Sequence, residues 1–215
     1  MNEIHLAPAP HARLRRRHLL GGTAALGVLL SAAACNVLPS PFPPPINRLP
    51  VGGRPYFWAG VNYPWKTGQD FGNGAWGHSG VSDPTTYREI DADFGTMAAQ
   101  GVRVIKWRVF GDGRYAPEFA PNGAVTGYDP FFYRDLDAAL EIAARHDIRL
   151  VFTMFDSGFW ATNCRSGDVQ MGGHALTVLN PSTRQSIVDR AITPLLQHVA
   201  KSDRVLAYEI IAEPE

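Results

Sequence analysis

Along most of this chain, segments with two different patterns of apolar residues alternate. Short runs rich in β-branched and aromatic residues predict four strands, at residues 56–63, 102–110, 149–156 and 205–211. Longer segments with helical spacing of their apolar residues predict three helices between them, at 85–100, 132–146 and 182–200. This alternation is typical of β-α-β units on a parallel sheet, so the predicted fold class is α/β.

The helix boundaries carry local signals of their own. Asp83 can cap the first helix, with Pro84 at its first position, and Gly101 is expected to end it. Pro194 lies inside the last predicted helix and is expected to kink it, because proline removes a backbone donor and clashes with the preceding turn.

Four β/α units fit either a small open sheet or half of an eight-unit barrel. A complete (β/α)8 barrel needs typically 250 residues, whereas this chain has 215 and its last predicted element is a strand. A terminal parallel strand without a covering helix leaves an exposed edge. We therefore interpret residues 55–215 as the N-terminal half of a TIM barrel.

The first fifty residues differ from the rest. Arg13 to Arg17 are followed by an uncharged apolar run from Leu19 to Ala34, which is short for a bilayer span of about 20 residues and ends in small residues. Residues 1–35 are predicted to be an export signal, with a retained membrane anchor as the alternative. Arg16-Arg17 resembles a twin-arginine signal. The proline-rich stretch within 36–54 is predicted to be an extended linker.

Cys35 follows Ala32-Ala33-Ala34, an arrangement that resembles the lipobox of bacterial lipoproteins. The resemblance implies that Cys35 is acylated, and the alternative is a secreted protein cleaved nearby. Localisation is therefore predicted as exported, with membrane contact only through a lipid anchor or the signal segment.

Composition excludes several functions. Lys plus Arg and Asp plus Glu both number 20, so no basic surplus favours nucleic acid. The histidines show no ligand spacing and two cysteines cannot form a four-thiolate site, so neither metal nor cofactor is expected. Residues 72–77 have G-x-G-x-x-G spacing but do not open a predicted helix, which argues against a dinucleotide site.

The residues at the predicted strand ends carry the candidate chemistry, because reactive groups gather there in β/α barrels. Gly60-Val61-Asn62 ends the first strand, an aromatic-rich second strand runs into 110–114, and the fourth ends in Glu213-Pro214. With these motifs, residues from about Tyr56 to Glu215 resemble the retaining (β/α)8 glycoside hydrolases of family 5, the cellulase-like and β-mannanase-like enzymes.

That resemblance implies that Glu213 is the general acid/base. Ala212 stands where the family has an asparagine that binds the sugar, which is a departure from the pattern. The nucleophile would follow a seventh strand, which is absent here, so the 215 residues alone are expected to be inactive. Lys106 or Arg108 is expected to supply the basic residue of the second strand, and Asn62 to bind substrate. Glu209, deeper on the last strand, is predicted to form a structural pair.

Aromatic residues near the strand ends suit stacking against sugar rings, with core packing as the alternative. The candidates are Trp65, Trp76, Trp107, Phe159 and Trp160. Trp107 is the candidate most expected to be structural, whereas Trp65 and Trp160 are in loops. Asp156 is expected either to bind a sugar hydroxyl or to cap the segment after it.

The sequence thus predicts part of an exported hydrolase that cleaves β-linked glycans, with an oligo- or polysaccharide as its partner. One alternative is an inactive carbohydrate-binding relic or truncated gene product. Another is a barrel enzyme of a different reaction class, since this fold carries many chemistries.

Overall fold

The computed structural model describes residues 49–51, 54–68, 70–72 and 80–212. The chain divides into two units, Met1–Pro45 and Ile46–Glu215, and all described residues belong to the second. The predicted signal and lipidation site at Cys35, as well as Trp76 and Glu213, lie outside the described residues.

The second unit begins earlier than the predicted boundary at residue 55. Strand β1 (Leu49–Val51) pairs antiparallel with β2 (Arg54–Tyr56), with Pro50 opposite Pro55. Residues 49–54 fell within the predicted linker, which was inferred from the proline-rich stretch before them. The end of the predicted linker is therefore a short hairpin.

The central element is a four-stranded parallel sheet with the order β10-β7-β4-β3. Its strands are β3 (Gly60–Asn62), β4 (Val104–Arg108), β7 (Arg149–Phe155) and β10 (Val205–Ile211). All four lie within the predicted runs, and each strand pairs with its neighbour in sequence, as in consecutive units of a barrel. The α/β prediction and its parallel sheet are confirmed, although β3 is much shorter than the predicted 56–63.

The two faces of the sheet differ. Ile105 and Trp107 of β4 and Phe152 of β7 are fully buried under helices, in the same cluster as the apolar faces of those helices. The residues between them, including Lys106 and Thr153, point to the opposite face, because side chains alternate along a strand. We call the first the covered face and the second the open face.

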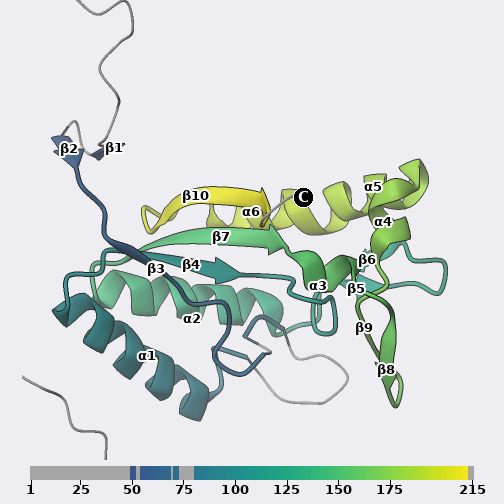
Figure 1. The fold of residues 1–215 in the computed structure, drawn as a ribbon, viewed down its shortest axis with the longest axis horizontal. Helices are drawn as coiled ribbons and strands as arrows, with labels where there is room; N and C mark the ends of the chain where they lie inside the picture. The colour runs from purple at the N-terminus through teal and green to yellow at the C-terminus, as the bar shows by residue number, and fades with distance from the viewer. Residues whose placement is uncertain (1–48, 52–53, 69, 73–79, 213–215) are drawn as a thin grey trace, which may run out of the picture. The chain divides into compact units, whose positions relative to one another are not determined.

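Three helical segments supply the cover. Helix α1 (Pro84–Ala99) begins as predicted, since Asp83 accepts hydrogen bonds from the backbone N–H groups of Thr85 and Thr86. Helix α2 (Phe132–Arg145) buries one apolar face, and Figure 1 shows α1 and α2 on the same side of the sheet. Both helices agree with the sequence prediction to within a residue or so at each end.

The third predicted helix is continuous but changes its winding. It consists of α5 (Pro181–Ile187), a π-helical turn η1 (Val188–Ile192) and α6 (Thr193–Val199). The wider turn lies directly before Pro194, whose ring would clash with the carbonyl four residues earlier in a regular α-helix. The chain thus accommodates Pro194 by a π turn.

Several small elements lie in the connections beyond the carboxyl ends of β4 and β7 (Figure 1). They are the hairpin β5 (Glu118–Phe119) and β6 (Val125–Gly127), helix α3 (Ser157–Trp160), the hairpin β8 (Cys164–Ser166) and β9 (Val169–Met171), and helix α4 (Ala175–Leu179). None of them was predicted. Their strands have three residues or fewer, too few for a hydrophobic period to be visible.

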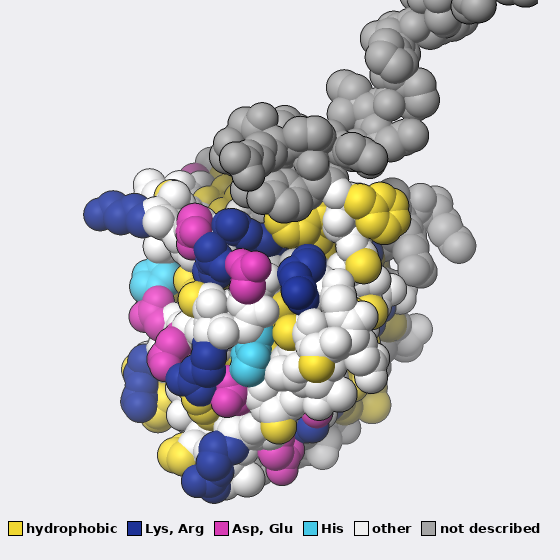
Figure 2. Space-filling view, turned by 90° about the vertical axis from the view of Figure 1, so that its left-hand side faces the viewer, with side chains coloured by type: hydrophobic (Ala, Val, Ile, Leu, Met, Phe, Trp, Pro, Cys, Tyr) yellow, Lys and Arg dark blue, Asp and Glu magenta, His cyan; other side chains and the backbone are white. Residues whose placement is uncertain are grey.

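The amino end of the sheet has short connections tied by ion pairs. Arg204 Nη1 lies 3.2 Å from Asp147 Oδ1, and Arg204 also pairs with Asp203. Figure 2 views this end and shows basic and acidic side chains interspersed.

Within the described ranges, no helix is long and apolar enough to cross a membrane.

Candidate active site

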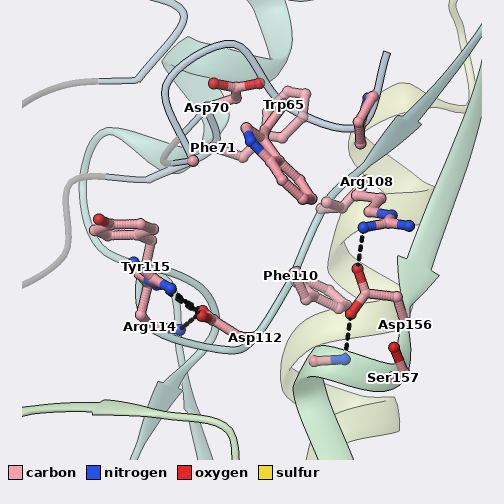
Figure 3. Close-up of a pocket in the computed structure, with 15 residues that line it drawn as sticks. Trp65, Asp70, Phe71, Arg108, Phe110, Asp112, Arg114, Tyr115, Asp156 and Ser157 are labelled. Carbon is pink, nitrogen blue, oxygen red and sulfur yellow. Dashed lines mark hydrogen bonds and ion pairs between the residues drawn. The ribbon is translucent and has the colours of Figure 1, made fainter. Parts of the chain in front are cut away.

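A pocket of about 450 Å³ opens at the carboxyl end of the sheet. Its lining comes from the connections that follow β3, β4 and β7, including Trp65, Arg108, Tyr115 and Asp156. Figure 3 shows Trp65, Arg108 and Asp156 on one side and Arg114 and Tyr115 on the other. This is the end of a β/α sheet at which barrel enzymes build their active sites.

Among the described residues, Arg108 and Arg114 are the two cations that line the pocket, and Arg108 lies beside Trp65. Its Nη1 lies 3.0 Å from Oδ2 of Asp156, and its guanidinium carbon lies 5.3 Å from the centroid of the Trp65 ring. Asp156 also caps α3, because its Oδ1 accepts a 2.7 Å hydrogen bond from the backbone N–H of Gly158. The capping alternative for Asp156 is therefore observed. Asp156 is also among the residues that line the pocket.

Trp65 is the aromatic residue best placed to stack on a ligand. It is 52% exposed and lines the pocket. Trp160, in contrast, is half-buried, packs at 5.0 Å from Phe159 and is not among the residues that line the pocket. Phe159 is fully buried. Among these three candidates, the structure brings only Trp65 to the pocket.

Trp107 requires a correction. Its side chain is completely buried on the covered face, where its ring packs against Tyr63 and Phe71. Its burial is incompatible with stacking on a sugar. Instead, Trp107 Nε1 donates a 2.8 Å hydrogen bond to Oδ2 of Asp70, which ties the loop after β3 to strand β4.

Asp70 was not found by sequence reasoning. Its carboxylate also accepts hydrogen bonds from the backbone N–H groups of Lys66, at 2.7 Å, and Thr67, at 3.0 Å. The residue is buried, yet several donors satisfy it. Asp70 therefore shapes the pocket wall that carries Trp65, and nothing in its local sequence signals this role.

The opposite wall is built by a second charged pair. Arg114 Nε lies 2.8 Å from both carboxylate oxygens of Asp112, and this pairing raises the pKa of the guanidinium. Tyr115 follows directly and lines the pocket beside Arg114. These residues stand in the segment after β4 that carries the resemblance, but sequence reasoning did not select them as site residues.

Lys106 and Asn62 lie deeper, on the open face. Asn62 is exposed and is in register with Lys106 on the neighbouring strand. Lys106 Nζ lies 2.7 Å from Oε2 of Glu209, which also accepts a 2.6 Å hydrogen bond from the hydroxyl of Thr153. Neither Lys106 nor Asn62 lines the pocket, whereas Arg108 does. Of the two basic residues that the sequence left open, the structure therefore favours Arg108 for ligand contact.

Glu209 forms the structural pair that the sequence predicted. Desolvation acts to raise the pKa of its carboxyl, but the hydrogen bonds from Lys106 and Thr153 outweigh it, and the pKa lies below its ordinary value. The carboxylate therefore stays ionised at neutral pH. A permanently ionised, paired carboxylate is unsuited to donate a proton to a leaving group.

Ala212 is the last described residue. It is buried, and its backbone N–H donates a 2.8 Å hydrogen bond to the carbonyl of Phe155. The chain after β10 therefore lies next to the carboxyl end of β7, where Asp156 follows Phe155. The predicted acid Glu213 is the next residue and lies outside the described ranges.

The arrangement is suited to bind a neutral, polyhydroxylated ligand. It combines a half-exposed indole ring, beside the Arg108 guanidinium, with charged pairs whose oxygens and N–H groups can exchange hydrogen bonds with hydroxyls. Among the described residues no group of His, Cys, Asp and Glu side chains has the geometry of a metal site.

The fold and the pocket define the class: consecutive β/α units with a ligand site at the carboxyl end, as in (β/α)8-barrel enzymes. No family model matches the chain. It is similar, however, to the mannan endo-1,4-beta-mannosidases of Mytilus edulis, at 29% identity over 195 residues, and Cryptopygus antarcticus, at 26% over 168 residues. These alignments cover 89% and 76% of this chain but 48% and 40% of the relatives.

Solved structures agree. The beta-mannanase of the blue mussel Mytilus edulis matches with a TM-score of 0.61 and 25% identity, over 79% of this chain and 44% of that one. The endo-1,4-beta-mannanase of Eisenia fetida matches with a TM-score of 0.65 and 26% identity, over the same shares of each chain. The predicted resemblance to barrel glycoside hydrolases is confirmed, and the chain spans less than half the length of these relatives.

Proposed function

We propose that this chain is part of a retaining glycoside hydrolase that acts on β-1,4-linked mannan. Glu213 serves as the acid/base, and the pocket around Trp65, Arg108 and Asp156 binds the sugar. Retaining hydrolysis also requires a nucleophilic carboxylate about 5 to 5.5 Å from the acid. We assign that group to a part of the enzyme outside these 215 residues.

One observation carries this proposal: the exposed indole of Trp65 stands beside the Arg108–Asp156 pair in a pocket at the carboxyl end of the sheet. The similarity to β-mannanases extends over most of the described residues and supports the choice of substrate. Mannan is uncharged, and a pocket whose described lining holds three carboxylates and two guanidinium groups has little net charge, which is also consistent with it.

Binding to the 215-residue chain tests the pocket without requiring turnover. Titration with β-1,4-manno-oligosaccharides, followed calorimetrically, should show saturable binding. Trp65→Ala should weaken it by about tenfold because the stacking surface is lost. Trp160→Phe is the matched control: it keeps an aromatic ring outside the pocket and should bind like wild type. Equal loss in both variants, or no binding by wild type, would contradict the proposal.

The catalytic part is tested in the complete enzyme. Glu213→Gln should lower turnover by roughly 10²- to 10⁴-fold, because it removes the proton donor while leaving a similar shape. Glu209→Gln serves as the comparison at the same strand. It should alter stability more than the pH dependence of turnover. Unchanged turnover in Glu213→Gln would remove Glu213 from its role.

A catalytically inactive carbohydrate-binding relic is the second candidate. Ala212 favours it, because this buried methyl group offers no hydrogen bond where the related enzymes have an amide. Ala212→Asn distinguishes the two in the complete protein. A rise in turnover supports an enzyme weakened at this position, whereas binding without turnover in either form supports the relic.

We also propose that the chain is exported and anchored through acylated Cys35. Metabolic labelling with a fatty acid should mark the wild-type protein and not Cys35→Ser. Replacing Arg16 and Arg17 with lysine should retain the protein in the cytoplasm if the twin-arginine route is used. Labelling that persists in Cys35→Ser would exclude this anchor.

A further inference from the structure

The segment that carries Trp65 is fixed on both sides of that residue. Tyr63 precedes it and Lys66 follows it, and both side chains reach one carboxylate oxygen on helix α1. The hydroxyl of Tyr63 donates a 2.7 Å hydrogen bond to Oδ2 of Asp93, and Lys66 Nζ lies 2.8 Å from the same atom. Asp93 therefore holds the residues on either side of Trp65, which itself lines the pocket.

The backbone between these two anchored residues has little freedom. The backbone N–H of Tyr63 donates a 2.8 Å hydrogen bond to a carbonyl of strand β4. Pro64 follows, and its ring fixes the backbone dihedral φ. The backbone N–H of Lys66 is held in turn by the carboxylate of Asp70. A displacement of either anchored residue is therefore transmitted to Trp65 between them.

The ring of Tyr63 directs its hydroxyl toward Asp93. It packs edge-on against Phe94 of α1 and Trp107 of β4, with centroid distances of 5.7 and 5.4 Å. Phe94 and Trp107 are both fully buried, so this packing is rigid. Asp93 is 37% exposed and is not among the residues that line the pocket. It can therefore affect a ligand there only through other residues.

The carboxyl group of Asp93 is ionised at neutral pH. Desolvation acts to raise its pKa, but the hydrogen bonds from Lys66 and Tyr63 outweigh this effect, and the pKa lies below its ordinary value. Hydrogen bonds to an ionised acceptor are roughly twice as strong as those between neutral groups. The ionised oxygen therefore holds its two donors more firmly than a neutral acceptor would.

Trp65 has limited packing of its own to orient it. The residue is 52% exposed, and the guanidinium carbon of Arg108 lies 5.3 Å from the centroid of its ring. A half-exposed ring receives less support from the core than a buried one, so the backbone at its base has a larger share in directing it. A ring already held in the orientation that a ligand requires lowers the entropy cost of binding.

We propose that Asp93 of α1 is a positioning residue for the indole of Trp65. It has no contact with the ligand and acts through Tyr63 and Lys66, which it fixes on either side of the ring. The consequence for sugar affinity rests on the proposed function. The inference adds a residue of the outer helical layer to the groups on which that affinity depends.

A double-mutant cycle tests whether Asp93 acts through Trp65. Asp93→Ala should lower the affinity of the 215-residue chain for β-1,4-mannotetraose by about 3- to 10-fold, because the ring is no longer held in place. In the Trp65→Ala background the same change should cost less than about 2-fold. Equal losses in both backgrounds would overturn the proposal.

Asp91→Ala is the matched control. This carboxylate lies two residues earlier on α1 and also bridges two partners, but they are Arg145 and His146 at the end of α2. Its loss removes a comparable surface anchor without touching the segment around Trp65. Affinity in Asp91→Ala should therefore equal that of wild type, and a loss as large as in Asp93→Ala would contradict a specific role for Asp93.

A measurement without ligand separates this inference from the proposed function. In the chain labelled with fluorotryptophan, the fluorine resonance that disappears in Trp65→Phe belongs to Trp65. Asp93→Ala should shift or broaden that resonance, whereas Asp91→Ala should leave it unchanged. An unchanged resonance in Asp93→Ala overturns the positioning role. If the resonance shifts but wild type binds no oligosaccharide, the proposed function fails and the positioning of the ring stands.

A second variant guards against misfolding of Asp93→Ala. Tyr63→Phe combined with Lys66→Met removes both donors, keeps the packing of the ring and the hydrocarbon stem, and leaves the carboxylate to water. It should reproduce the loss in affinity of about 3- to 10-fold and the altered Trp65 resonance. Wild-type affinity together with an unchanged resonance in this variant would overturn the proposal.

Discussion

The two ends of the parallel sheet are built differently. At the amino end, residues 100–103, 146–148 and 200–204 connect each helix to the next strand. At the carboxyl end, the connections 63–83, 109–131 and 156–180 are several times longer. The short connections are tied by ion pairs between the half-buried Arg204 and exposed carboxylates, whereas the long ones hold buried polar groups, hairpins and the pocket.

This difference determines what holds the connections of each end in place. Short connections cost little conformational entropy, so exposed ion pairs of modest strength are sufficient there. Long connections cost more and require buried anchors such as Asp70 and Asp135, which fix them to the sheet and to α2. The anchors should therefore matter far more than the ion pairs, and substitutions at each end can test this expectation.

Asp135 should give the largest effect. It is fully buried on α2, and its carboxylate accepts hydrogen bonds from the backbone N–H groups of Gly72, at 2.8 Å, and Ser82, at 2.7 Å. Asp135→Ala leaves these buried N–H donors without an acceptor and should lower the free energy of unfolding by about 3 to 5 kcal/mol. Asp137→Ala, two residues along the same helix and exposed, should cost less than about 1 kcal/mol. Urea unfolding measures both, and equal costs would contradict the anchor role.

Substituting either of two glycines in the loop after β4 should give the next largest loss of stability. Gly111 and Gly113 both have positive φ, at 51° and 78°. A Cβ at Gly113 would lie 2.6 Å from two ring atoms of His174, whereas one at Gly111 would meet nothing within 4 Å. Gly113→Ala should cost about 2 to 4 kcal/mol, from backbone strain and overpacking together. Gly111→Ala should cost only the strain, about 1 to 2 kcal/mol.

Thermal unfolding of the two variants measures the difference. If Gly111→Ala and Gly113→Ala lose the same stability, His174 is not held as tightly against the loop as its burial indicates.

His174 should make the carboxyl end sensitive to acid. Burial lowers its pKa from 6.5 to about 4, so the unfolded chain binds the proton more readily than the folded one. The effect of His174 on the free energy of unfolding is fully favourable above pH 6.5. It is lost as the pH decreases from 6.5 toward 4, and the total loss is up to about 3 kcal/mol. His174→Phe should flatten this part of the stability profile, measured by urea unfolding between pH 4 and 7. An unchanged slope would assign the acid sensitivity to other groups.

The ion pairs at the amino end should give the smallest effect. Arg204, whose own side chain is 15% exposed, pairs with Asp147 and Asp203, whose carboxylates are 79% and 72% exposed to solvent that screens the attraction. Arg204→Ala should cost no more than about 1 kcal/mol, and high salt should reduce the difference from wild type. Unfolding at low and high salt measures it. A cost comparable to that of Asp135→Ala would erase the contrast between the two ends.

Much of the fold could be predicted from the sequence, because the strands that build the sheet and the helices that cover it have clear hydrophobic periods. The Asp83-Pro84 helix start is a local signal and was predicted correctly. The hairpins at the carboxyl end are short, and the sequence between β4 and α2 contains no hydrophobic period that distinguishes them from irregular loop.

The candidate site was predicted only in part. Trp65, Arg108 and Asp156 lie at strand ends, where the barrel architecture directs attention. Asp70 contacts Trp107 across 37 positions of the chain, and no local pattern reveals such a pairing. The alternation along β4 could have shown that Trp107 points away from Lys106 and Arg108, so that all three cannot serve one site.

The bond between Lys106 and Glu209 has a consequence for the shape of the sheet. Their strands are separated by β7, so their backbones lie roughly 10 Å apart, yet Nζ and Oε2 approach to 2.7 Å. The two side chains meet above Thr153 and bridge β4 and β10 across the intervening strand β7. The ion pair therefore favours curvature of the sheet toward the open face. The open face then lines the inside of the curved sheet, and the covered face lies outside, beneath its helices.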